Sequence, residues 1–116
     1  MNTAYFDCFS GISGDMVIGA FLDAGLDFNW LEKTVAGLGL SGYELTCEKK
    51  LKNGITGTSF RVSVDEDHPH RGLSDITRII TGSTLQEKVK NDAISIFGIL
   101  AKAEARIHSK SVDDIH

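Results

Sequence analysis

The chain has little of what marks secreted, membrane-spanning or nucleic-acid-binding proteins. Its 116 residues include one proline and two cysteines, which argues against a proline-rich linker, a disulfide framework or a cysteine-based metal site. No apolar run reaches the length of a membrane span, and no basic, cleavable signal peptide is evident. A net charge of −4 argues against a broad nucleic-acid or anionic-membrane surface. We therefore expect a cytoplasmic protein with reduced thiols.

What is present is the composition of an ordinary globular domain, and its periodicity predicts an α+β fold. Hydrophobic residues make up 41% of the chain and charged residues 24%, which allows one domain over 1–116 to bury a core. We expect a small antiparallel or mixed sheet, made of an N-terminal strand and a hairpin, covered by helices in a two-layer sandwich. In chain order, the pattern predicts a strand at 4–8, a helix at 16–24, a helix capped by Asp27, a hairpin turning at Asn53-Gly54, a short helix capped by Ser74, and a long helix from a capping box at Thr84 and Glu87 to about Ile107.

The long C-terminal helix predicts contacts beyond this domain. It would be roughly 33 Å long at 1.5 Å per residue, so we expect part of its apolar face to meet another domain or subunit, and the protein to be a homo-oligomer. Ser111 then resembles the cap of a further helix, yet the sequence ends at His116. We therefore expect 1–116 to be the N-terminal fragment of a longer chain.

A glycine-rich loop follows the predicted first strand and precedes a helix. A helix N-terminus presents backbone N–H groups to anions, and the two carboxylates that bracket the loop suit a hard cation such as Mg²⁺, which can bridge to phosphate. The alternative is a tight turn whose side chains only cap the helix. We expect Asp7 and Asp15 to be the catalytic residues of this loop, and Ser10, Gly11, Ser13 and Gly14 to bind the phosphate or cofactor.

Histidines form the second candidate site. His68 and His70 flank Pro69 in an acidic stretch, and neutral imidazoles suit borderline metals such as Ni²⁺. The alternative is a solvated polar loop. His108 lies four residues after Glu104 on the long helix, where pairing with the carboxylate or the helix C-terminus is the structural alternative. His116 has the same ambiguity.

Four segments, at 5–16, 70–76, 101–108 and 112–116, carry a resemblance that spans nearly the whole chain. They read YFDCFSGISGDM, HRGLSDI, AKAEARIH and VDDIH. In this order they resemble the N-terminal part of the LarC family, the nickel-insertion proteins of nickel-pincer cofactor biosynthesis.

The resemblance implies a chelatase or cyclometallase, a lyase that inserts nickel into a pyridinium bisthiocarboxylic acid mononucleotide. It implies CTP with Mg²⁺ or Mn²⁺ as cofactors, bound through a C-terminal domain that this chain lacks, so that the fragment alone would be inactive. It also places nickel handling on His68 and His70. To these we add His108 and His116 as further candidate ligands. Many members have a longer histidine run, which Pro69 interrupts here. The shorter run argues against high-capacity nickel storage but is compatible with a nickel transfer site.

Two other functions remain open. The chain would be a non-catalytic metal-binding or oligomerisation domain if its long helix only forms an interface. It would be a nucleotide- or phosphate-binding module if only the glycine loop is functional.

Overall fold

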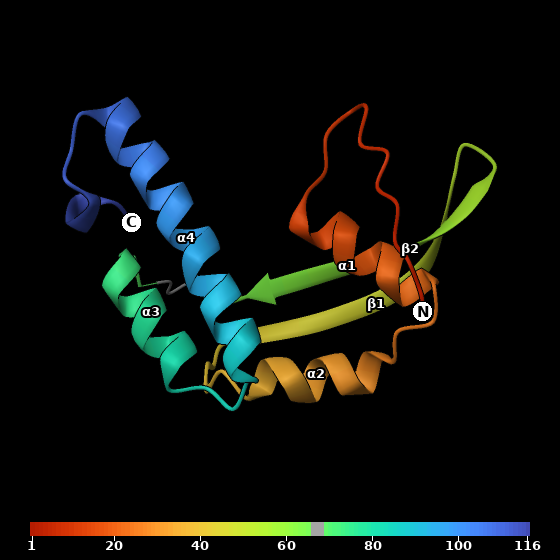
Figure 1. Cartoon of the computed structure of the whole chain (residues 1–116). Coiled ribbons are helices and arrows are strands. Elements are labelled where there is room, and N and C mark those ends of the chain that lie inside the picture. Colours follow the sequence, from red (N-terminus) through yellow and green to blue (C-terminus); the bar gives the residue numbers. More distant parts are fainter. Residues whose placement is uncertain (66–68) are drawn as a thin grey trace.

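The computed structural model describes residues 1–65 and 69–116 and confirms the α+β class. Its helices and strands follow one another with short connections (Figure 1). In order they are α1 (Gly14–Asp23), α2 (Phe28–Ala36), β1 (Tyr43–Lys52), β2 (Ile55–Val64), α3 (Leu73–Thr81), α4 (Glu87–His108) and the 3-10 helix η1 (Val112–Asp114). No helix in the described part of the chain combines the length and apolar character that a bilayer crossing requires.

The predicted hairpin is confirmed in its turn and its register. β1 and β2 pair antiparallel, with Lys52 opposite Ile55. The two turn residues, Asn53 and Gly54, have φ values of 51° and 78°, as a type I′ turn requires, and its twist matches that of the strands. Alternation of side chains then buries Leu45 and Phe60 on one face of the hairpin.

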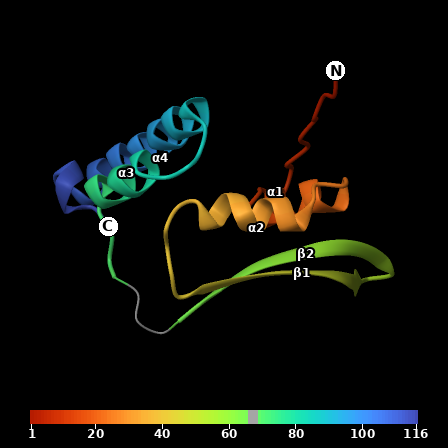
Figure 2. The ribbon, with the colours of Figure 1, turned by 90° about the horizontal axis from the view of Figure 1, so that it is seen from below.

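Helices α1 and α2 cover that face of the hairpin (Figure 2). Gly19 is the buried residue of α1, and a Cβ at this position would lie 2.8 Å from the carbonyl oxygen of Thr58 on β2. The helix can approach the strand this closely because glycine has no side chain. Asp23, the last residue of α1, accepts hydrogen bonds from Lys49 on β1 and Thr58 on β2. The C-terminal end of α1 is therefore bonded to both strands of the hairpin.

Helices α3 and α4 form the second part of the molecule and lie side by side in both views (Figures 1 and 2). Ile80 of α3 and Ala101 and Ala105 of α4 are buried, because small side chains on α4 let the two helices pack closely. The turn before α4 is tied to the end of α2 by a 3.1 Å hydrogen bond from the Thr84 N–H to the Gly37 carbonyl. This bond links the two parts of the fold.

The prediction of a strand at 4–8 is wrong. The described residues contain one sheet, of order β1-β2, and residues 1–13 adopt no regular structure. Tyr5 and Phe9 are 89% and 92% exposed, while Phe6 packs edge to face on Phe21 of α1 with ring centres 6.0 Å apart. The segment has strand-forming residues, but a strand is stable only where another strand offers it hydrogen bonds.

Two predicted helix caps are also wrong. Gly72, not Ser74, precedes α3, and the Asp75 carboxylate accepts a 3.2 Å hydrogen bond from the Gly72 N–H. Helix α4 begins at Glu87 after Gln86 and has no side-chain cap, so Thr84 and Glu87 form no capping box. In the turn before α4, the buried Ser83 hydroxyl donates to the Ile80 carbonyl. In both cases the local hydrogen bond is made by a residue other than the predicted cap.

The fold exposes much more surface than its size requires. Its accessible surface is 9189 Å², whereas the scaling for folded monomers gives about 6,200 Å² at this mass. Its radius of gyration is 16.3 Å, against about 13.4 Å for a compact domain of this length. The hairpin part and the α3–α4 part are therefore spread apart rather than packed around one core.

Candidate functional site

The glycine loop adopts the geometry of a helix cap. The Gly11 N–H donates to the Cys8 carbonyl at 3.0 Å, with Gly11 at φ 87°, which forms a tight turn ahead of α1. The Ser13 hydroxyl donates to the Asp15 carboxylate at 2.5 Å and accepts from the Met16 N–H at 3.4 Å. The Ser13 hydroxyl and the backbone N–H groups of Asp15 and Met16 hold the pKa of the Asp15 carboxyl below its ordinary value.

The other loop candidates are open to solvent. Asp7 and Ser10 are exposed in the irregular segment before α1, and Gly14 is the first residue of that helix. The catalytic role of Asp7 and the binding roles of Ser10, Gly11 and Gly14 stay predictions. Ser13 and Asp15 already have a structural role as the cap, which is the alternative that the sequence left open.

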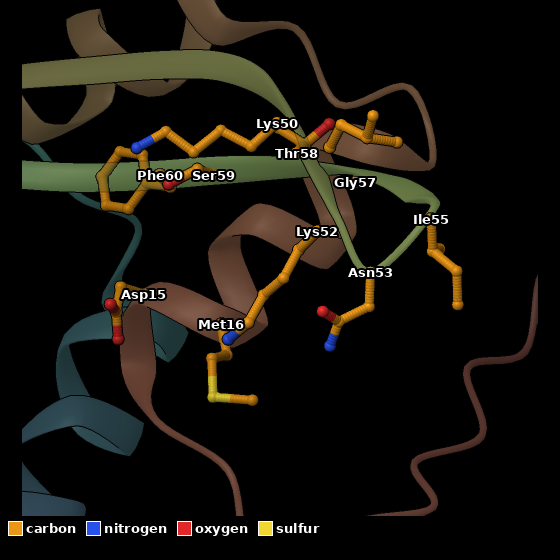
Figure 3. A pocket seen from close by; sticks show the side chains of 11 residues that line it. Asp15, Met16, Lys50, Lys52, Asn53, Ile55, Gly57, Thr58, Ser59 and Phe60 are labelled. Atoms are coloured by element: carbon orange, nitrogen blue, oxygen red, sulfur yellow. The ribbon is translucent and has the colours of Figure 1, made fainter.

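A cavity of about 590 Å³ adjoins this loop, between the start of α1 and the distal end of the hairpin. Figure 3 shows Asp15 and Met16 at the start of α1, and Lys50 and Lys52 on the hairpin; all four line the cavity. Lys50 pairs with Glu48 at 2.9 Å. The lining thus combines the Lys52 cation and the Asp15 carboxylate with the apolar residues Met16, Leu51, Ile55 and Phe60.

The structure brings together two predicted ligands from distant parts of the sequence. The imidazole rings of His70, which precedes α3, and His116, at the end of the chain, are 4.9 Å apart between centres, at an interplanar angle of 78°. On α4, His108 and Glu104 form the expected pair, with 3.2 Å between Nε2 and Oε2. His68 lies outside the described residues.

Two cavities in the α3–α4 part are lined by His116 and Glu104, and one of them also by His108. The first, of about 270 Å³, is lined by His116, Arg71 and Glu104 with the apolar side chains Leu73, Ile76, Phe97, Leu100, Ala101 and Ile115. The second, of about 240 Å³, is lined by Glu104, His108, Lys110, Asp114, Ile115 and His116. His116 and Glu104 border both cavities, so the His70–His116 pair and the Glu104–His108 pair are neighbours. Among residues 1–65 and 69–116, however, no cluster of three or more His, Cys, Asp or Glu side chains is arranged to hold a metal ion.

The glycine loop and the imidazole pair lie in different parts of the fold. The loop belongs to α1 over the hairpin, whereas the C-terminus lies next to α3 (Figure 1). The sequence could not show the approach of His70 to His116, because the two residues are 46 positions apart (116 − 70). Sequence reasoning also did not predict that Arg71 lines a cavity, although Arg71 belongs to the segment at 70–76 that carries the resemblance.

Known proteins match the chain throughout. A family model described as nickel insertion protein matches residues 4–116. The pyridinium-3,5-bisthiocarboxylic acid mononucleotide nickel insertion proteins of two Desulfitobacterium hafniense strains, DCB-2 and Y51, are 54% identical over 116 residues, covering all of this chain. A protein of the same name from Acetivibrio thermocellus is 42% identical over 125 residues, again covering the whole chain. The chain spans 29% and 31% of the length of these relatives, respectively. No solved structure matches it.

Proposed function

The chain belongs to the nickel insertion protein family, and from this premise we propose that it presents Ni²⁺ for insertion into a pyridinium-3,5-bisthiocarboxylic acid mononucleotide. This substrate is the one after which its relatives are named. We assign the presentation of nickel to the α3–α4 part, with His70 and His116 as the ligands that hold the ion. His68 is a further candidate outside the described residues.

The approach of the His70 ring to the His116 ring is the observation that carries this proposal. A divalent ion bound by two imidazoles at about 2.1 Å per nitrogen, with an angle of about 90–110° at the ion, holds the ring centres roughly 4.5–5.3 Å apart. The observed separation is 4.9 Å. Edge-to-face packing of two rings gives a similar distance without an ion, so nickel titration is the measurement that separates the two.

A site with only two protein ligands suits a nickel ion that is to be transferred to the substrate. Nickel must leave the protein for the carbon and sulfur atoms of the substrate, and a closed coordination shell would hold it back, as closed shells do in structural metal sites. The described residues supply no third ligand in place. Positions therefore stay open for substrate atoms. Glu104, which lines both cavities, or His108, which lines the smaller one, can assist transfer.

The reaction of the whole protein is part of the same proposal. We propose that the complete protein is a chelatase or cyclometallase of the lyase class that works in the cytoplasm and consumes CTP with Mg²⁺ or Mn²⁺. The residues described here do not fit that nucleotide: Ser13 and Asp15 are bonded to each other in the helix cap, and no cluster within the described ranges suits its metal. We therefore assign CTP to the additional length of the relatives.

A second candidate function rests on the cavity beside the glycine loop. Lys52 supplies a cation to its lining, and α1 begins at its edge, so it could bind a phosphate-bearing ligand without any metal. Turnover of the full protein with Asp15→Asn tests this idea. Unchanged turnover would leave the loop with its capping role alone.

Nickel titration by calorimetry tests the main proposal. We expect His70→Ala and His116→Ala each to weaken Ni²⁺ binding by about tenfold or more, because either change removes one of two ligands. His108→Ala is the matched control, since this histidine faces Glu104 and not the ring pair, and its Ni²⁺ affinity should change less. Wild-type affinity in the His70→Ala/His116→Ala double variant would remove the ring pair from the mechanism.

A further inference from the structure

Arg71 is a charged residue at the candidate site to which the nickel proposal gives no role. It follows His70 directly in the sequence and, like His116, lines the 270 Å³ cavity next to α4. It also lines a separate cavity of about 660 Å³ on the hairpin side of the linker. Arg71 is therefore the one described residue that lines both of these cavities, and it directly follows His70 of the ring pair.

The chemistry of Arg71 favours an oxyanion. A guanidinium group is always charged and presents planar, paired N–H donors that match the two oxygens of a carboxylate or phosphate. Arg71 is exposed, and it forms no ion pair with a carboxylate within residues 1–65 and 69–116. By contrast, Arg78 on the neighbouring helix is paired with Asp75 at 2.8 Å.

Aromatic and apolar side chains near Arg71 can pack against a ring attached to that oxyanion. The 270 Å³ cavity is lined by Phe97, Leu100 and Ile115, and an aromatic face such as that of Phe97 also attracts a cationic ring. The separate 660 Å³ cavity is lined by Tyr43, Val62 and Val64, with the carboxylate of Asp65. The smaller cavity has room for a single ring rather than a whole nucleotide, since ligand pockets usually measure about 300–1,000 Å³, and the larger one has room for the remainder.

We propose that Arg71 binds an oxyanion of the substrate and so positions its pyridinium ring against the nickel-holding imidazoles. This inference rests on the proposed function, because it takes His70 and His116 as the nickel ligands. Fixing the substrate by one ion pair beside the metal turns the transfer of nickel into a reaction between groups already in place. Arg71 acts here as a positioning residue. Glu104 in the same cavity opposes the anion, and its carboxylate lies 3.2 Å from the His108 imidazole.

Binding of nicotinic acid mononucleotide, a carboxylated pyridinium mononucleotide, tests the assignment. We expect Arg71→Gln to weaken its binding by about tenfold or more, as hydrogen bonds to charged groups contribute roughly 1.5–3 kcal/mol. Arg71→Lys should recover part of that loss, because it keeps the charge but loses the paired geometry. Inorganic phosphate and nicotinate, titrated separately, show which oxyanion Arg71 holds.

Two further variants separate this inference from its alternatives. Arg106→Gln removes an exposed arginine from α4 outside the cavity and is the control, whereas Lys52→Gln removes a cation from the cavity beside the glycine loop and tests that cavity as the alternative binding site. Arg106→Gln should not change mononucleotide binding, and Arg71→Gln should keep its Ni²⁺ affinity and its urea midpoint. Wild-type mononucleotide affinity in Arg71→Gln, a loss in Lys52→Gln instead, or no binding to the wild type would overturn the inference. Loss of nickel binding in the ring-pair variants tests the proposed function independently.

Discussion

Replacing Gly19 by alanine tests the closest helix–strand approach in the molecule. Two effects oppose each other in this variant. Alanine is favoured over glycine in a helix interior by about 0.8–1 kcal/mol. The new Cβ, however, would lie 2.8 Å from the Thr58 carbonyl oxygen, and an overpacked site of this kind costs about 1–3 kcal/mol. We therefore expect Gly19→Ala to lower the free energy of unfolding by up to about 2 kcal/mol.

Gly98 offers a matched control for the same substitution. It lies inside α4, and no heavy atom lies within 4 Å of the position that its Cβ would take. Only the helix-propensity effect remains there, so Gly98→Ala should raise the free energy of unfolding by about 1 kcal/mol.

Urea unfolding followed by circular dichroism gives both values. The difference between the two variants isolates the cost of the contact with β2, about 1–3 kcal/mol. If Gly19→Ala is stabilised as much as Gly98→Ala, then α1 does not lie against Thr58 and the described packing of the hairpin part is wrong.

Two further predictions concern the helix cap and the hairpin turn. Because hydrogen bonds lower the pKa of Asp15 in the folded state, its ionised form stabilises the fold above the ordinary carboxyl pKa, and this contribution is lost as the pH falls through the lowered value. Asp15→Asn should therefore be less stable than wild type at neutral pH, with the difference vanishing in acid; a constant difference in urea midpoint across the acid range would contradict this. Gly54→Ala should destabilise the chain by about 1 kcal/mol because Gly54 has a φ of 78°, and thermal unfolding that matches wild type would speak against the type I′ turn.

The elements that sequence reasoning identified correctly are those whose signals are local. The Asn53-Gly54 pair fixes the hairpin through its own backbone preference, and Ser13 and Asp27 cap their helices through bonds spanning two or three residues. The helix that ends at His108 was predicted to about Ile107 from its apolar stripe. Each of these can be recognised without knowing what lies beside it.

The errors arise where a partner decides the outcome. The residues at 4–8 have strand-forming side chains, but no strand in the described chain pairs with them. Thr84 has the sequence of a cap, yet its N–H is bonded to Gly37. At the candidate site, the individual histidines could be predicted, whereas the approach of His70 to His116 and the place of Arg71 in the lining of two cavities depend on how α3, α4 and the chain end pack.

The two-stranded sheet leaves the outer backbone of both ten-residue strands without a β partner in the described chain. Such edges can recruit strands from other molecules and begin aggregation. Lys52, at the distal end of β1, opposes this because a second hairpin arriving edge to edge would bring like charges together; Lys49 and Lys50 on the same strand are paired with Asp23 and Glu48. The solubility of this region thus depends on charge that salt can screen, which makes ionic strength a variable to control whenever the protein is concentrated.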